Sequence, residues 1–293
     1  MTRGPLALLG FLATACGARG PDVIYLPSAT DVVTRMLTVA RVGADDVVYD
    51  LGCGDGRIVI AAVRDHGARG VCVDIDPSRV AESRRNAATA GVADRIDFRR
   101  ADMFETDLGE ATVVALYLSP SLNVRLRPKL FREVRPGARI VSHNFDMGDW
   151  EPDTVVHVTW PAGTTSAVQA WVLPADVAGT WELTIPPSSG QRRFRVRFAQ
   201  QYQQVTGTAS RDGRTVALSE VRLVGDSLEF QLSESSGDRS RSLGFVGRVS
   251  GGEIAGRVRS ATDTIDGTWR AVRPSRGGPS PDGGSASSDR SAR

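Results

Sequence analysis

The segment that most constrains the fold is residues 47–56, in which an apolar run and an aspartate precede three glycines at alternate positions. The apolar run predicts a buried parallel strand, and the turn after it leads into a helix that begins near Arg57. Glycines at 52, 54 and 56 allow positive φ and leave room for a ligand beside the main chain, because they carry no Cβ. The segment therefore predicts a cofactor cradle.

Strand and helix patterns alternate up to His143, which predicts a parallel α/β sheet covered on both faces. The expected helices are 31–41, 57–66, one from Asp76-Pro77 to Gly91, and one from Ser119-Pro120 to about 134. The expected strands begin with the run at 47 and continue with 70–74, 96–99, 111–118 and 139–143. Residues 155–160 and 167–173 then predict a terminal antiparallel hairpin. We expect Ser28 or Thr30 to cap the first helix.

The pattern changes at Gly179, where short alternating segments separated by glycines predict a small all-β, barrel-like domain. Gly-Thr-Trp occurs at 179–181 and again at 267–269, which would suit first and last strands that lie side by side. The pair weakly resembles lipocalin-like barrels, and two aromatic core residues are the alternative. The expected regions are a signal-like N-terminus at 1–22, an α/β domain at 23–175, the β domain at 179–273 and a disordered tail at 274–293.

Composition excludes few functions. The 293 residues are long enough for about two domains, and the net charge of +2 without basic blocks gives no sign of nucleic-acid binding. Arg3, the apolar run 5–15 and Cys16 have the layout of a bacterial secretory signal with a cysteine for lipid modification. The alternative is an extended start of a cytoplasmic protein, so membrane attachment or export and a cytoplasmic location both stay open.

Cys53 and Cys72 are the only other cysteines. One lies in the glycine turn and one inside a strand, and we interpret both as small apolar fillers rather than a disulfide framework.

Aspartates follow three neighbouring strands of the predicted sheet: Asp50 and Asp55 in the glycine turn, Asp74 and Asp76 after the second strand, and Asp102 after the third. Such carboxylates would repel the pyrophosphate of a dinucleotide, whose fingerprint also has a different glycine spacing. They suit S-adenosylmethionine, which has no phosphate and carries a sulfonium and an ammonium.

In this arrangement we expect Asp74 to meet the ribose hydroxyls and Asp102 the adenine amino group. Asp76 has a structural alternative as a helix cap, and Asp55 as a residue that orders the turn.

Three segments, 50–56, 73–76 and 100–102, resemble in order and spacing the motifs of class I S-adenosylmethionine-dependent methyltransferases. Tyr25-Leu-Pro and the segments 48–52, 123–130 and 141–145 are similar to the seven-strand lysine methyltransferases of archaea and mitochondria and their bacterial relatives. The resemblance covers about 23–172 and implies a Rossmann-like methyltransferase sheet. It does not cover the β domain.

This resemblance implies a set of cofactor contacts, to which the charge pattern adds Asp55: Tyr25, Asp50, Gly52, Gly54, Asp74 and Asp102. It places Tyr117, Asn123 and His143 near the methyl-transfer site, although each also has a purely structural interpretation. Methyl transfer is an in-line displacement that requires positioning and substrate deprotonation, but no metal and no covalent nucleophile.

The first functional hypothesis is a methyltransferase that acts on a protein lysine or another small nucleophile, with the β domain recruiting substrate or lying near a membrane. The fourth strand ends in Tyr-Leu-Ser-Pro, without the tetrad associated with methylation of planar amino groups, which weakens nucleobase methylation. The second hypothesis is an exported, non-enzymatic binding protein that retains a methyltransferase scaffold. A small-molecule O-methyltransferase is a third.

Overall fold

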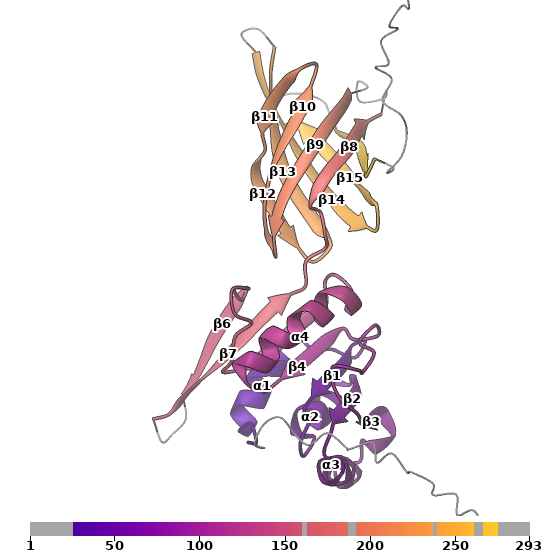
Figure 1. The fold of residues 1–293 in the computed structure, drawn as a ribbon, viewed down its shortest axis with the longest axis vertical. Helices are drawn as coiled ribbons and strands as arrows, with labels where there is room; N and C mark the ends of the chain where they lie inside the picture. Colours follow the sequence, from indigo (N-terminus) through magenta and orange to yellow (C-terminus); the bar gives the residue numbers. More distant parts are fainter. Residues whose placement is uncertain (1–25, 160–162, 187–191, 237–238, 261–265, 275–293) are drawn as a thin grey trace, which may run out of the picture. The chain divides into compact units, whose positions relative to one another are not determined.

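A computed structural model describes residues 26–159, 163–186, 192–236, 239–260 and 266–274. The predictions about the signal-like N-terminus with Cys16, about Tyr25 and about the tail 275–293 lie outside these residues. Two compact units form, one from Met1–Val134 and Arg139–Trp171 and the other from Arg135–Ala138 and Val172–Arg293 (Figure 1). In the part of the chain that the structure describes, no helix is both long and apolar enough to cross a membrane.

The first unit is the predicted α/β sheet with its terminal hairpin. Its helices are α1 (Thr30–Val39), α2 (Arg57–His66), α3 (Pro77–Thr89), the short 3-10 helix η1 (Ala93–Arg95) and α4 (Pro120–Glu133). Its strands are β1 (Val47–Leu51), β2 (Arg69–Asp74), β3 (Ile96–Arg100), β4 (Val113–Leu116), β5 (Arg139–His143), β6 (Thr154–Thr159) and β7 (Thr165–Val172). The strand order is β3-β2-β1-β4-β5-β7-β6, with β1 to β5 parallel and β6 antiparallel to β7.

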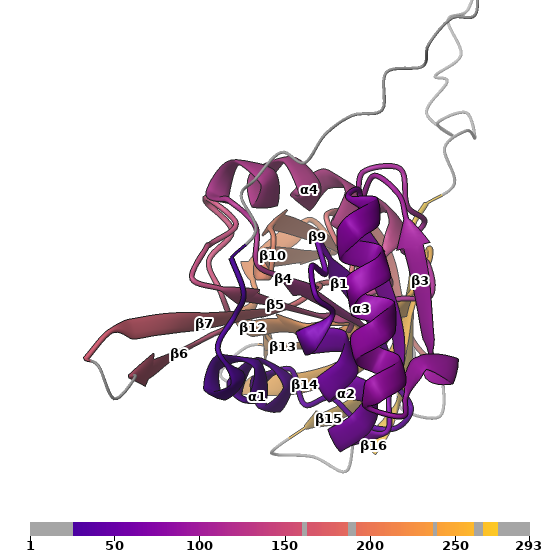
Figure 2. The ribbon, with the colours of Figure 1, turned by 90° about the horizontal axis from the view of Figure 1, so that it is seen from below.

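Helices cover both faces of this sheet. α1 and α2 share one apolar core with β1, β4 and β5, whereas α4 lies on the opposite face (Figure 2). The strand order reverses between β1 and β4, and the carboxyl ends of the parallel strands meet at one edge. In open α/β sheets a ligand binds at such a point of reversal.

The helix ends are mostly as expected. Asp76 caps α3 by accepting a hydrogen bond of 2.8 Å from the amide of Ser78, and Ser119 caps α4. The expected cap of the first helix is wrong: Ala29 occupies the N-cap position of α1, without a side-chain cap. The hydroxyl of Ser28 is instead directed to His143, 2.8 Å away.

The second unit is one antiparallel sheet of nine strands, in the order β11-β10-β9-β8-β16-β15-β14-β13-β12, which curls until it is nearly closed. The strands are β8 (Gly179–Ile185), β9 (Arg192–Gln201), β10 (Gln204–Arg211), β11 (Arg214–Ala217), β12 (Ser219–Val224), β13 (Ser227–Ser236), β14 (Arg239–Ser250), β15 (Glu253–Ser260) and β16 (Asp266–Val272). β8 pairs with β16, so the predicted contact between first and last strands is confirmed.

Aromatic rings fill much of the interior of this sheet. Phe230 stacks on Phe245 at a centroid distance of 4.7 Å, and Trp269 meets both rings edge-on at 5.7 and 5.4 Å. Trp181 and Trp269, from the two Gly-Thr-Trp segments, are almost completely buried. Both tryptophans are therefore core residues of neighbouring strands.

Gly70 sets how closely α2 packs on β2, and its replacement tests this packing. A Cβ at Gly70 would lie 2.3 Å from Cγ2 of Val59, whereas a Cβ at Gly43 would meet no atom within 4 Å. We expect Gly70→Ala to lower the free energy of unfolding by about 1–3 kcal/mol through overpacking, and Gly43→Ala to change it by less than about 0.5 kcal/mol. Denaturant titration of both variants measures the difference, and equal midpoints would contradict the packing argument.

Candidate active site

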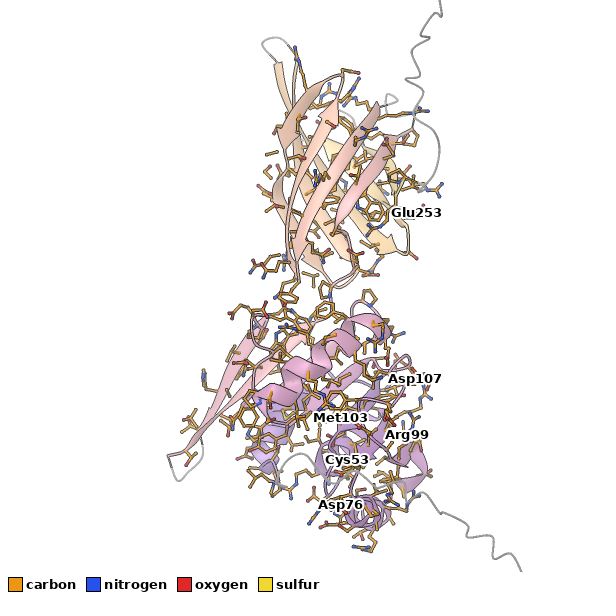
Figure 3. The ribbon with its side chains drawn as sticks, viewed as in Figure 1. Cys53, Asp76, Arg99, Met103, Asp107 and Glu253 are labelled. Carbon is orange, nitrogen blue, oxygen red and sulfur yellow. A yellow bond between two sulfur atoms is a disulfide. The ribbon has the colours of Figure 1, made fainter. Side chains whose placement is uncertain are left out.

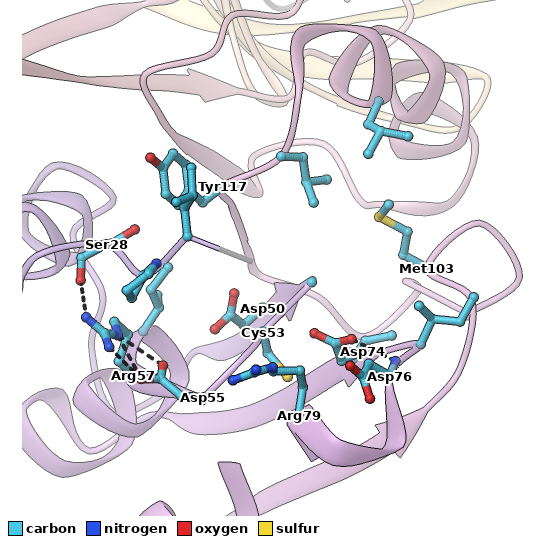
Figure 4. A pocket seen from close by; sticks show the side chains of 18 of the residues that line it. Ser28, Asp50, Cys53, Asp55, Arg57, Asp74, Asp76, Arg79, Met103 and Tyr117 are labelled. Atoms are coloured by element: carbon cyan, nitrogen blue, oxygen red, sulfur yellow. Dashed lines mark hydrogen bonds and ion pairs between the residues drawn. The ribbon is translucent and has the colours of Figure 1, made fainter. Parts of the chain in front are cut away.

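A cavity of about 490 Å³ opens at the carboxyl edge of the first unit's sheet (Figure 4). Its volume is in the usual range for small-molecule sites. The ends of β1, β2, β3 and β4, the start of α4 and residues 26–28 line it. The predicted residues that it brings together are Asp50, Gly52, Asp55, Asp74, Asp102 and Tyr117. Tyr25 lies outside the described residues.

The glycine turn folds back over the end of β2. The amide of Gly52 donates to the carbonyl of Val73 at 2.8 Å, and the amide of Gly54 donates to Oδ2 of Asp74 at 2.9 Å. Gly52 has a φ of +79°, and a Cβ there would lie 2.9 Å from Leu118. The backbone therefore forms the floor of the cavity at a position where a side chain would be strained and would collide.

Asp50 is the buried charge of the site, with only 2% of its surface exposed. Its Oδ2 has no hydrogen-bond partner among the described residues. Burial raises the pKa of this carboxyl to about 7. The backbone amide of Val59 partly opposes this rise, because its hydrogen bond stabilises the ionised form, whereas repulsion from Asp74 and Asp55 raises the pKa a little further. A cation that entered the cavity would supply the missing partner.

The other aspartates make contacts within the protein. Asp74 accepts from the amides of Gly54 and Asp76, and Asp102 accepts from the amide of Phe104. Asp55 forms a two-pronged ion pair with Arg57, whose Nη1 also donates to the carbonyl of Ser28 at 2.6 Å. Arg57 therefore holds the segment before α1 against the glycine turn and offsets part of the acidic charge.

Tyr117 is part of a stack of rings at the ends of β4 and β5. Its ring is 3.9 Å from that of His143 and 6.0 Å from that of Phe145, in parallel planes to within 24° and 17°. His143 is 2% exposed and does not line the cavity; its ring nitrogens lie 2.8 Å from Ser28 Oγ and 3.1 Å from Ser166 Oγ. Burial lowers the pKa of His143 to about 4, so the ring is neutral near pH 7.

Asn123 does not line the cavity either. It is fully buried on α4, and its Nδ2 donates to the carbonyls of Phe145 at 3.1 Å and Asp146 at 3.0 Å. The side chain thus holds the loop after β5, which carries Phe145 of the ring stack.

The interpretation of the cysteines as apolar fillers is wrong, because Cys53 and Cys72 form a disulfide. The hydrogen bonds from the amides of Gly52 and Cys53 to Val73 bring the turn onto the end of β2, and the two Cα atoms lie 5.4 Å apart. That separation suits a disulfide. Figure 3 labels Cys53 in the first unit, where it lines the same cavity as Met103.

Known proteins resemble this part of the chain. Residues 50–154 match the model of the ANTKMT methyltransferase domain. A protein-lysine N-methyltransferase of Saccharolobus islandicus (strain REY15A) is 45% identical over 139 residues, which are 47% of this chain and 86% of that protein. The chain belongs to the ANTKMT methyltransferase family. It is an S-adenosylmethionine-dependent methyltransferase, so the predicted enzyme class and cofactor are confirmed, and the alternative of a non-enzymatic binding protein gains no support.

Two further relatives are informative about coverage. The mouse adenine nucleotide translocase lysine N-methyltransferase is 33% identical to the methyltransferase over 46% of this chain, which spans only 58% of the mouse protein. A crystal structure described as an RNA methyltransferase from Salinibacter ruber, in complex with S-adenosyl-L-homocysteine, is 53% identical and covers 52% of this chain and 96% of that one, with a TM-score of 0.49.

The donor set of the methyltransferase fits its cofactor. Oδ2 of Asp50, which has no hydrogen-bond partner within the described part of the chain, would pair with a cation, and Gly52 presents main chain without a Cβ to the cavity. Sequence reasoning missed two residues of this site, Ser28 and Arg57. Arg57 could have been suspected from its place two residues after Asp55, whereas Ser28 looked like a helix cap.

Cofactor affinity should depend on pH through Asp50. A cation binds the ionised carboxylate, so protons compete with it as the pH falls through about 7. We expect the Kd for S-adenosylmethionine to rise about tenfold between pH 8 and pH 6, and Asp50→Asn to bind weakly with a flat profile. Isothermal titration calorimetry measures both. Asp94→Asn, an exposed position on η1, serves as the control, and a wild-type Kd independent of pH would refute the assignment.

Proposed function

We propose that this methyltransferase methylates the ε-amino group of a protein lysine. The observation that carries the proposal is the 45% identity to a protein-lysine N-methyltransferase, of which the match covers 86%. Relatives named for lysines of the adenine nucleotide translocase and of the ATP synthase support the same acceptor class.

Specific residues would hold the cofactor. We assign the ammonium group to Asp50, the ribose hydroxyls to Asp74 and the adenine side to Asp102, because these carboxylates follow successive strands along the cavity. The amides of the glycine turn form the floor beneath them. When bound, S-adenosylmethionine supplies an activated methyl group on a sulfonium, whose charge also disfavours an ammonium beside it.

The acceptor amine must be neutral before it can attack. Apolar side chains that line the cavity, Leu26, Met103, Leu118 and Leu122, would favour the neutral amine by excluding water. Tyr117 lines the same cavity and can orient the amine through its ring and hydroxyl.

We assign His143 a positioning role rather than that of a proton acceptor. A ring with a pKa near 4 has little affinity for the proton of an ammonium group, and it lies behind Tyr117 rather than in the cavity. Held between Ser28 and Ser166, it supports the face of the tyrosine ring. Asn123, on α4, supports the same stack by holding the loop after β5 through its hydrogen bond to the carbonyl of Phe145.

The second unit is proposed to recruit the acceptor or to lie near a membrane. In support, the match to the Saccharolobus islandicus enzyme needs only 47% of this chain to cover most of that protein. The β unit is therefore an addition to the catalytic unit, since the Saccharolobus islandicus enzyme has little chain beyond the matched residues.

The acceptor class can be tested with isotopically labelled S-adenosylmethionine and a pool of soluble proteins. We expect label on lysines of the native pool and none on an acetylated copy, because acetylation removes the nucleophilic amine. Self-labelling should be small, since Lys129 is the only lysine, is 7% exposed and pairs with Glu133. Peptide mass analysis locates the methyl group. Equal labelling of the acetylated pool, or of RNA instead of protein, would overturn the proposal.

The role of His143 can be tested with His143→Asn, Tyr117→Phe and Tyr117→Ala. Loss of ring support should lower kcat about tenfold in His143→Asn, with an unchanged Kd for the cofactor. Tyr117→Phe keeps the stacked ring and should retain more activity than Tyr117→Ala. If His143 were the proton acceptor, kcat would fall at least about a hundredfold, and the acid limb of the pH profile of kcat/KM would disappear.

A further inference from the structure

The disulfide between Cys53 and Cys72 lies inside the cofactor-binding apparatus. Cys53 stands between Gly52 and Gly54 in the turn that forms the cavity floor, and Cys72 precedes Asp74 by two residues on β2. The bond therefore links the glycine turn covalently to β2, the strand that ends in Asp74.

The two sulfur atoms differ in access. Cys53 lines the cavity (Figure 4) and is 5% exposed. Cys72 is fully buried, with its Sγ 3.2 Å from Oγ of Ser83 on α3. A reagent that reaches the bond must therefore approach Cys53 through the cavity. The cofactor and such a reagent would compete for the same space.

We propose that Cys53–Cys72 is a thiol–disulfide exchange site that opens into the cofactor cavity, so that cofactor occupancy and the redox state of this pair control each other. The co-reactant is a small thiol, or its disulfide for the reverse reaction. The proposal rests on the assigned cofactor site and not on the identity of the methyl acceptor.

The exchange balances as two ordinary steps. A thiolate attacks Sγ of Cys53, the bond between the two sulfurs breaks, and Cys72 leaves as a thiolate that takes up a proton. A second thiol then attacks the mixed disulfide and releases Cys53. The protein pair gains two electrons, and two small thiols are oxidised to one disulfide.

The surroundings can accommodate both states. The hydroxyl of Ser83 donates to the carbonyl of Val80 at 3.0 Å, so its oxygen can accept a hydrogen bond from a Cys72 thiol. Hydrogen bonds from Gly52 and Gly54 hold the turn to β2 even without the covalent bond. The reduced turn is glycine-rich and freer, so it should bind the cofactor less tightly.

Coupling of this kind is reciprocal. If reduction weakens cofactor binding by some factor, bound cofactor must make reduction unfavourable by the same factor. The cofactor should in addition slow the reaction, because it covers Cys53, the one sulfur of the disulfide that lines the cavity.

The test uses the full chain, dithiothreitol as the thiol and S-adenosyl-L-homocysteine as the cavity ligand. Alkylation followed by peptide mass analysis follows Cys53 and Cys72 separately from Cys16. We expect saturating ligand to slow reduction at least about tenfold. Equal reduction rates with and without ligand, or two free thiols at Cys53 and Cys72 in an oxidising glutathione buffer, would overturn the proposal.

Calorimetry provides the second measurement. Reduction should weaken the affinity of the wild type for S-adenosyl-L-homocysteine severalfold, and the double variant Cys53→Ser/Cys72→Ser should show no response to dithiothreitol. An unchanged wild-type affinity would refute the reciprocal coupling. Failure of the oxidised wild type to bind the ligand at all would instead contradict the cofactor assignment, so the two failures are distinguishable.

Discussion

The close contact between the glycine turn and the end of β2 builds the cavity in which the cofactor would bind. Two amides of the turn converge on the carbonyl of Val73, and a third reaches Asp74, so the floor of the cavity is built from backbone rather than side chains. Gly52 makes the contact possible because its φ is positive and Leu118 leaves no space for a Cβ. The disulfide at Cys53 strengthens the same contact, which makes it the natural place for a redox effect on the cofactor.

Two effects limit the negative charge in the cavity: an ion pair at Asp55 and burial at Asp50, which favours the protonated carboxyl. Asp55 is engaged by Arg57, whereas Asp50 has an unpartnered oxygen among the described residues and a pKa raised to about 7. Burial acts on His143 in the opposite sense and keeps the ring neutral. The site therefore combines a carboxylate that can pair with a cation and a neutral histidine ring that stacks on Tyr117.

Local patterns in the sequence predicted much of the fold and part of the site. Strand β5 and helix α2 were predicted to the residue, because apolar periodicity, Gly67 and the prolines mark the ends of elements locally. The individual strands of the β domain are less local: β12 and β15 lie in stretches rich in polar residues, whose strand conformation depends on pairing with neighbours. The position of β7 between β5 and β6 likewise depends on the assembled sheet.

The sequence by itself determined the parallel sheet, the glycine turn and the acidic series along its edge, because each of these is written in residues close together in the chain. Only the tertiary structure decided which side chains meet. Ser28 and His143 are 115 residues apart, and their contact turns a supposed helix cap into a support for Tyr117. Cys53 and Cys72 looked like apolar fillers until the turn folded back on β2 and joined them at the floor of the cavity.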